Sequence, residues 1–325
     1  MDQAVARADL ALVATGPAKG EVRFAAMGNS AHVMVLADDD VKVSSLIDAA
    51  RGYAARLEAA WSRFIPTSDV YRLNTARGRA VRISSDTEVL IRHLLAAFDA
   101  TEGLFDPFVL PALIQAGYSA SMSGDDGHSC AAAAPTGKPC SASVYLESVE
   151  GETWCRLLDG ATIDPGGLGK GLAADIIAER LMLEGAHGVL VSMGGDVRCI
   201  GDSPDAAGWV IDIETQCHPV FGSTTVVMAS GGIATSTTHA KRWHGGHHVI
   251  DPSTMLPTDE TSASSLRQSS VIASTAVWAE VFATATLVAG AATAGLLIES
   301  HGLAARFERV DGLPLLTSGF ERYAR

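Results

Sequence analysis

The stretch IDPGGLGKGLAAD, residues 163–175, is the strongest structural signal in this chain. A β-branched residue and an acid, Ile163 and Asp164, lead into a turn that contains four glycines and one lysine, Lys170. The turn opens directly into an amphipathic helix. Glycines let a backbone approach a ligand closely, and free N–H groups at a helix start attract anions. The stretch therefore predicts a site for a phosphorylated ligand, with Lys170 as a point charge and Asp164 beside it.

The spacing of this turn excludes the two common nucleotide-binding loops. A P-loop places Ser or Thr after its lysine, where this chain has Gly171, and a dinucleotide loop reads G-x-G-x-x-G. The turn is therefore either another kind of ligand site or only the punctuation between a strand and a helix.

Composition restricts the class of protein. The chain has 325 residues, of which 47% are hydrophobic, and this length is sufficient for a large buried core. Its formal net charge is −13. Because nucleic-acid binding requires a basic surface, we expect no nucleic-acid partner. An acidic chain suits a site that holds a divalent cation.

Targeting and domain signals are few. Residues 1–20 have no apolar segment of the signal-peptide kind, and no run approaches the length of a membrane span. Five cysteines without C-x-x-C spacing indicate reduced thiols. We therefore expect a cytoplasmic protein without a membrane anchor, with a disordered tail over 1–20 and one domain over 21–325. Residues 119–143 are rich in Ser, Gly, Ala and Pro, which predicts a flexible insertion in that domain.

Hydrophobic periodicity predicts a mixture of helices and strands. The helices are expected at 43–64, 87–100, 109–116, 171–184 and 275–289. The strands are expected at 22–36 (with a turn at 27–29), 144–149, 153–158, 189–197, 209–213, 224–228 and 247–250. Because these elements do not alternate in a βαβ rhythm, the sequence predicts the α+β class.

Several acidic residues are candidates for chemistry. Asp106, Asp164, Asp196 and Asp251 each lie in a turn beside Gly or Pro, where an acid either serves a site or simply caps the turn. Glu280 and Thr284, four residues apart on one predicted helix, share a face and offer oxygen ligands to a cation. The alternative is an exposed glutamate in a first helical turn, with the threonine as packing.

The histidine-rich segment is a further candidate. His244, His247 and His248 do not have zinc-motif spacing, but one of them is suited to act as a general base near neutral pH. A structural histidine is the alternative. The preceding Lys241 and Arg242 either neutralise phosphate or form a solvated face.

Taken in order, these blocks resemble the ApbE family of flavin transferases, which move FMN from FAD onto a protein threonine. The resemblance runs from about residue 23 to the C-terminus, apart from 119–143. The matching blocks are residues 27–29, 64–74, 101–107, 164–175, 193–196, 232–236, 247–252 and 279–284.

The resemblance implies an α+β, ApbE-like fold related to the T-fold. In this fold mixed sheets pack with helices, and two interwoven halves hold the site between them. It also implies a magnesium-dependent transferase that uses FAD as its substrate. The partner would be an acceptor flavoprotein, whose threonine hydroxyl receives FMN while AMP is released.

The same resemblance implies roles for individual residues. The contacts to the flavin and adenosine parts of FAD would be Met27, Phe64, Phe105, Asp106 and Pro107. Asp164 and Lys170 would lie at the nucleotide, with Lys170 near the diphosphate. The magnesium ligands would be the Gly167 carbonyl, Glu280 and Thr284, so that Glu280 also counts as catalytic. His248 would be the base beside the reacting phosphate.

Departures from the family pattern leave two alternatives open. Glu280 stands where the family usually has Asp, Asn29 stands in place of a small hydroxyl residue, and the lipoprotein signal of exported members is missing. An ApbE-like scaffold for small-molecule biosynthesis, such as a Pictet–Spengler-type condensation, would need neither FAD nor magnesium. A flavin-binding carrier would hold FAD without releasing AMP.

Overall fold

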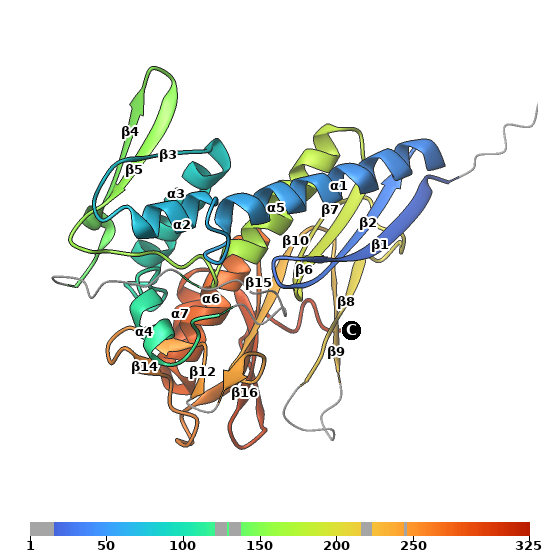
Figure 1. Cartoon of the computed structure of the whole chain (residues 1–325). Coiled ribbons are helices and arrows are strands. Elements are labelled where there is room, and N and C mark those ends of the chain that lie inside the picture. The colour runs from blue at the N-terminus through green and yellow to red at the C-terminus, as the bar shows by residue number, and fades with distance from the viewer. Residues whose placement is uncertain (1–15, 121–128, 130–137, 216–222, 244–245) are drawn as a thin grey trace, which may run out of the picture.

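The centre of the fold is an eight-stranded sheet (Figure 1). The computed structural model describes residues 16–120, 129, 138–215, 223–243 and 246–325. All neighbouring strands of this sheet pair antiparallel. In spatial order the strands are β1 (Ala18–Ala26), β2 (Asn29–Ala37), β6 (Gly188–Met193), β7 (Asp196–Gly201), β10 (Gly231–Thr237), β15 (Leu266–Ala273), β16 (Ala304–Arg309) and β17 (Pro314–Leu316).

Helices cover one face of this sheet. They are α1 (Asp40–Trp61) on β1 and β2, α5 (Gly169–Leu183) on β6 and β7, α6 (Ala276–Ala289) on β10 and β15, and α7 (Ala291–Ser300) on β16. The opposite face packs against the hairpin of β8 (Trp209–Ile213) and β9 (Thr224–Met228). Because side chains alternate along a strand, Val189 and Val191 face the helices while Leu190 faces the hairpin.

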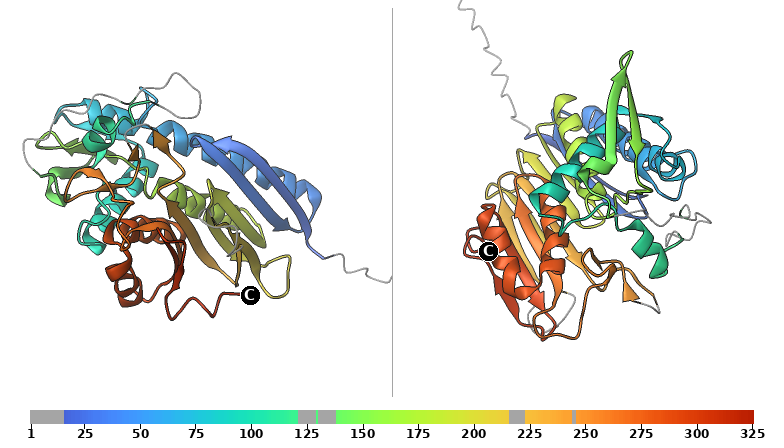
Figure 2. Two further views of the ribbon diagram at one scale, coloured as in Figure 1. Left: turned by 90° about the horizontal axis from the view of Figure 1, so that it is seen from below. Right: turned by 90° about the vertical axis from the view of Figure 1, so that its left-hand side faces the viewer.

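Smaller elements extend the fold beyond the end of α1. They are α2 (Asp69–Thr75), β3 (Val81–Ile83), α3 (Ser85–Ala100), α4 (Leu110–Gln115), β4 (Val144–Val149) and β5 (Glu152–Leu157). The hairpin of β4 and β5 projects from the rest of the molecule (Figures 1 and 2). Four two-residue strands follow β10 and form two pairs: β11 (Arg242–Trp243) with β12 (Gly246–His247), and β13 (Ile250–Asp251) with β14 (Leu256–Pro257).

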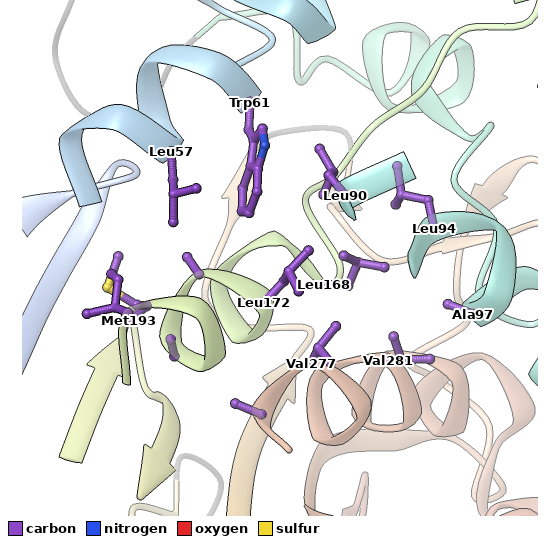
Figure 3. Packing of buried hydrophobic residues seen from close by; sticks show 14 of the residues in the cluster. Leu57, Trp61, Leu90, Leu94, Ala97, Leu168, Leu172, Met193, Val277 and Val281 are labelled. Carbon is purple, nitrogen blue, oxygen red and sulfur yellow. The ribbon is translucent and has the colours of Figure 1, made fainter. Parts of the chain in front are cut away.

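One continuous core joins these regions (Figure 3). Helix α1 buries a stripe with the three- and four-residue spacing of an amphipathic helix: Val43, Leu46, Ala50, Ala54, Leu57 and Trp61. Figure 3 shows Leu57 and Trp61 above Leu168 and Leu172 at the start of α5, with residues of α3 and α6 closing the cluster. The first turns of α5 and α6 are therefore fixed from several sides.

Helices α5 and α6 cap each other with carboxylates. Asp175 of α5 accepts hydrogen bonds from the N–H groups of Ala276 and Val277, at 2.9 and 2.8 Å, and so caps the start of α6. Glu280 of α6 accepts a hydrogen bond from the N–H of Gly171 at 2.7 Å. The helices approach so closely that a Cβ atom at Gly171 would lie 2.5 Å from the Ala276 carbonyl oxygen. Packing alone therefore requires glycine at this position.

The structure confirms the α+β class and the five predicted helices to within a few residues. Two strand predictions were wrong. Residues 189–197 contain a hairpin of β6 and β7, turned at Gly194 and Gly195 with φ of 63° and 97°. Residues 247–250 divide between β12 and β13, because each strand pairs with a different partner.

The predicted tail and insertion fall largely outside the described residues. Residues 1–15 lie outside them, but β1 begins at Ala18, inside the range 1–20 that we predicted to be disordered. The predicted boundary was therefore too late. Within 119–143, residues 121–128 and 130–137 also lie outside. The described end, Ser141–Ser143, forms a 3₁₀ turn, and Ser141 donates a hydrogen bond to Asp99 at 2.8 Å.

We predict that Asp175→Ala lowers the free energy of unfolding by about 3 kcal/mol. The substitution leaves two buried amide donors unpaired and removes the ion-pair partner of the buried Arg198, 3.3 Å away. Denaturant unfolding at neutral pH measures the change. The matched control is Glu179→Ala, which removes an exposed carboxylate from the same helix. Equal unfolding midpoints for the two variants would contradict the capping role.

Candidate functional site

A cavity of ≈ 290 Å³ lies where the starts of α5 and α6 meet the end of α1. Its walls come from segments that are far apart in the chain: the β1–β2 turn, the residues after α1, the Phe105 turn, the glycine-rich turn, β10, the segment around His248, and α6. Both the N-terminal and the C-terminal parts of the chain therefore contribute to it.

Ten of the eleven predicted site residues line this cavity. They are Met27, Phe64, Phe105, Asp106, Asp164, Gly167, Lys170, His248, Glu280 and Thr284. Pro107 is not among the lining residues, but its carbonyl accepts a hydrogen bond from the N–H of Asp164 at 2.8 Å. It therefore connects the Phe105 turn to the glycine-rich turn.

Lys170 lies between two buried carboxylates. Its ammonium donates hydrogen bonds to Asp196 and to Glu280, and both acids are 2% exposed. The second oxygen of Glu280 accepts the Gly171 N–H. When both acids are ionised, one positive and two negative charges leave this cluster with a surplus negative charge.

Burial and neighbouring charges shift the pKa values of Lys170 and Glu280. Burial lowers the pKa of Lys170, but the charges of Asp196 and Glu280 outweigh it and raise the pKa above its ordinary value. Burial raises the pKa of Glu280 to about 7, because it removes the carboxylate from water; the charge of Lys170 opposes this rise and the like charge of Asp196 adds to it. Lys170 is therefore firmly charged at neutral pH.

The glycine-rich turn serves packing as well as the cavity. A Cβ atom at Gly167 would lie 2.8 Å from the ring of Phe105, so the aromatic ring rests directly on the backbone. The anion that meets the start of α5 is the protein's own Glu280. The predicted attraction of this helix start for anions is therefore used, at least in part, inside the fold.

The three predicted metal ligands lie near one another. A Cβ atom at Gly167 would lie 3.7 Å from the methyl group of Thr284, and Thr284 is one helical turn after Glu280. The Thr284 hydroxyl is 3.1 Å from the Ser236 hydroxyl. In the described part of the chain, no group of three or more His, Cys, Asp or Glu side chains is arranged to hold a metal. A cation here would thus have one carboxylate and neutral oxygens as ligands.

The cavity also has an aromatic wall, of which only Phe64 was predicted. The guanidinium of Arg63, which is 4% exposed, lies 4.4 Å from the ring centroids of both Phe64 and Tyr118. It pairs with Asp164 at 3.1 Å and donates two hydrogen bonds to the Tyr118 carbonyl. Tyr118 in turn stacks on Trp243, with centroids 5.6 Å apart. Phe64 and Tyr118, which line the cavity, therefore share one buried cation, and Trp243 supports Tyr118 from outside the lining. We call these three residues the aromatic wall.

The two described histidines of the His-rich segment have different environments. His247 is buried, and its ring nitrogens are occupied by the Val249 N–H and the Thr258 carbonyl, so its role is structural. His248 lines the cavity, bonds to the backbone of Lys241, and has a buried Nδ1 without a partner. Burial and the nearby Lys241 charge lower the pKa of His248 to about 3. Its imidazole is therefore neutral near pH 7. His244 lies outside the described residues.

The four acidic turns divide into two kinds. Asp106 and Asp251 accept hydrogen bonds from N–H groups two residues later, which is ordinary turn chemistry, although Asp106 also faces the cavity. Asp164 and Asp196 instead pair with the distant cations Arg63 and Lys170. Local turn stability therefore does not account for the second pair.

The model of the ApbE family matches residues 27–307. The chain belongs to the ApbE family. A relative named FAD:protein FMN transferase from Escherichia coli (strain K12) is 31% identical over 147 residues, which cover 44% of this chain and 41% of the relative. The aligned stretch thus spans less than half of that relative. A second with the same name, from Haemophilus influenzae, is 25% identical over 300 residues and covers 86% of this chain and 83% of its own length.

Solved ApbE structures share the fold. The ApbE protein of Thermotoga maritima superposes with a TM-score of 0.79 at 22% identity, and covers 95% of this chain and 100% of its own. The flavinyl transferase ApbE of Pseudomonas stutzeri gives 0.76 at 22% identity, covering 95% and 97%. Among the residues described, none of the helices has both the length and the apolar character needed to cross a membrane.

We predict that the His248 ring stays neutral from about pH 5 to pH 8. Because burial holds its pKa at about 3, below the 6.5 of the unfolded chain, the unfolded state binds the proton more tightly. This residue therefore costs stability as the pH falls through 6.5. Ring ¹⁵N shifts, assigned by their loss in His248→Gln, measure the ionisation. Imidazolium shifts that appear near pH 6 would contradict the burial.

Proposed function

We propose that this chain transfers FMN from FAD to a threonine hydroxyl of an acceptor flavoprotein, with release of AMP. One observation carries the proposal: the residues implied for FAD, its phosphates and a metal converge on a single cavity, with Pro107 just behind it. The names of the relatives support transfer, and no observation favours small-molecule condensation or flavin carriage.

The apolar and aromatic walls suit the planar rings of FAD. Met27, Phe64 and Phe105 line the cavity, and Tyr118 offers a further ring beside Phe64. Aromatic faces stack well on planar heterocycles. Asp106 and Asp164 supply carboxylates at the same cavity, and Asp164 is oriented by Arg63. We assign these residues to the flavin and adenosine parts of the substrate.

The Gly167 carbonyl, Glu280 and Thr284 fit a magnesium ion. Carboxylate, hydroxyl and carbonyl oxygens are the hard ligands that this cation prefers, and its charge would balance the surplus negative charge of the Lys170 cluster. When bound, magnesium would supply neutralisation of the phosphate charge. Lys170 holds the Glu280 carboxylate in place through its ion pair and lies in the same cavity, where it stays a candidate contact of the diphosphate.

His248 is the candidate general base. In the transfer the threonine oxygen attacks the flavin-side phosphorus, and the bond from that phosphorus to the oxygen of AMP breaks. The hydroxyl proton passes to a base. The unpartnered Nδ1 of the His248 ring is our candidate for this base. For this role the negative charge of the bound substrate would have to raise its pKa from about 3 toward neutrality. The target threonine, the cytoplasmic location and the single domain over 21–325 stay predictions of this proposal.

Incubation with FAD, magnesium and candidate acceptor proteins tests the proposal. We expect AMP release and a fluorescent acceptor band, both abolished by EDTA. Glu280→Gln should lower turnover by roughly 100-fold, because loss of one group directed at developing charge costs about 3 kcal/mol. Glu280→Asp restores the carboxylate usual in the family and should keep most of the activity. Glu179→Gln, on the exposed face of α5, is the control.

Two results would count against the proposal. Wild-type protein that releases neither AMP nor FMN would remove the transferase assignment. Unchanged turnover in Glu280→Gln, with circular dichroism showing a folded variant, would remove Glu280 from the site.

A further inference from the structure

Three cationic side chains line the cavity, and two of them are already neutralised. Arg63 pairs with Asp164 at 3.1 Å. Lys170 is shared between Asp196 and Glu280, so its cluster has a net negative charge. Neither cation therefore presents an uncompensated positive charge to a phosphate.

Lys241 is the third cation. Within the described residues, no carboxylate lies within ion-pair distance of its ammonium. The ammonium lies 5.6 Å from the ring centroid of Tyr118, which places it over the aromatic wall. The backbone of Lys241 also hydrogen-bonds His248, so the residue is fixed beside the candidate base.

The neighbouring Arg242 has a different environment. Its guanidinium donates to both carboxylate oxygens of Glu260, at 2.7 and 2.8 Å, and it is not among the residues that line the cavity. The sequence left open whether these two cations neutralise phosphate or form a solvated face. The structure separates them, because Arg242 forms a surface ion pair while Lys241 enters the cavity.

We propose that Lys241 supplies the uncompensated positive charge that binds the phosphates of the nucleotide substrate, beside any contact from Lys170. This inference rests on the proposed function and specifies how its site holds a diphosphate. A diphosphate brings concentrated negative charge into a cavity that already contains Glu58, Asp106, Asp164 and Glu280. An unpaired ammonium at the wall offsets this repulsion and donates charge-assisted hydrogen bonds. Its place next to His248 puts that charge where the reacting phosphate would lie.

Binding titrations with four nucleotide-related ligands test the role of Lys241. FAD and ADP contain a diphosphate, whereas riboflavin and adenosine do not. We expect Lys241→Met to weaken the binding of FAD and ADP by roughly 10- to 100-fold, the range for loss of a charged hydrogen bond. Binding of riboflavin and adenosine should not change. Lys241→Arg should keep most of the affinity.

Arg242→Met is the matched control. It removes one positive charge at the adjacent position but outside the cavity, so the affinity for FAD should stay within about twofold, as for an exposed ion pair. The dependence of FAD affinity on salt should also be shallower in Lys241→Met than in Arg242→Met.

The outcomes separate this inference from the proposed function. Tight FAD binding to wild type with equal affinity in Lys241→Met would overturn the role of Lys241 and leave the transferase proposal standing. Equal losses in Lys241→Met and Arg242→Met would also overturn it, because they would indicate only a long-range charge effect. Absence of FAD and ADP binding to the wild type would overturn both.

Discussion

Two buried carboxylates, Asp175 of α5 and Glu280 of α6, each bind the start of the other helix, and the site depends on these two contacts. Asp175 caps α6, while Glu280 accepts the N–H of Gly171 and the ammonium of Lys170. Because each helix supplies the acid that the other needs, neither start is positioned without its partner. The glycine-rich turn and the α6 residues that face it therefore form one rigid wall, to which Asp196 is tied through Lys170.

The ion pairs around Glu280 also set the distribution of charge in the cavity. Lys170 is committed to two acids, which leaves a negative charge beside it when both are ionised, and Arg63 is committed to Asp164 at the start of the glycine-rich turn. A phosphorylated substrate then needs positive charge from elsewhere. A metal beside Glu280 and the ammonium of Lys241 would supply it, and His248 would lie beside the incoming hydroxyl.

Local sequence patterns predicted most helices, because caps, glycines and apolar spacing are short-range signals. Most of the site residues came from the resemblance to the ApbE family, and ten of those eleven line the cavity, whereas Arg63 and Tyr118 were not predicted. They did not predict that 189–197 turns back on itself. Both strands of that hairpin are largely buried, so their polar residues do not mark a break between them, and only Gly194 and Gly195 mark the turn. Glu280 lies 109 residues from Gly171, whose N–H it accepts, and Tyr118 lies 55 residues from Arg63. Pairings at such separations depend on the assembled fold, and a single sequence does not specify them.

The most direct test of this account is a crystal structure of the chain with FAD and magnesium. We expect FAD in the cavity between α5, α6 and the aromatic wall. Its diphosphate should lie next to Lys241 and His248, and the metal should contact Gly167, Glu280 and Thr284. FAD bound at a different surface, or a diphosphate that lies away from these residues, would contradict the account.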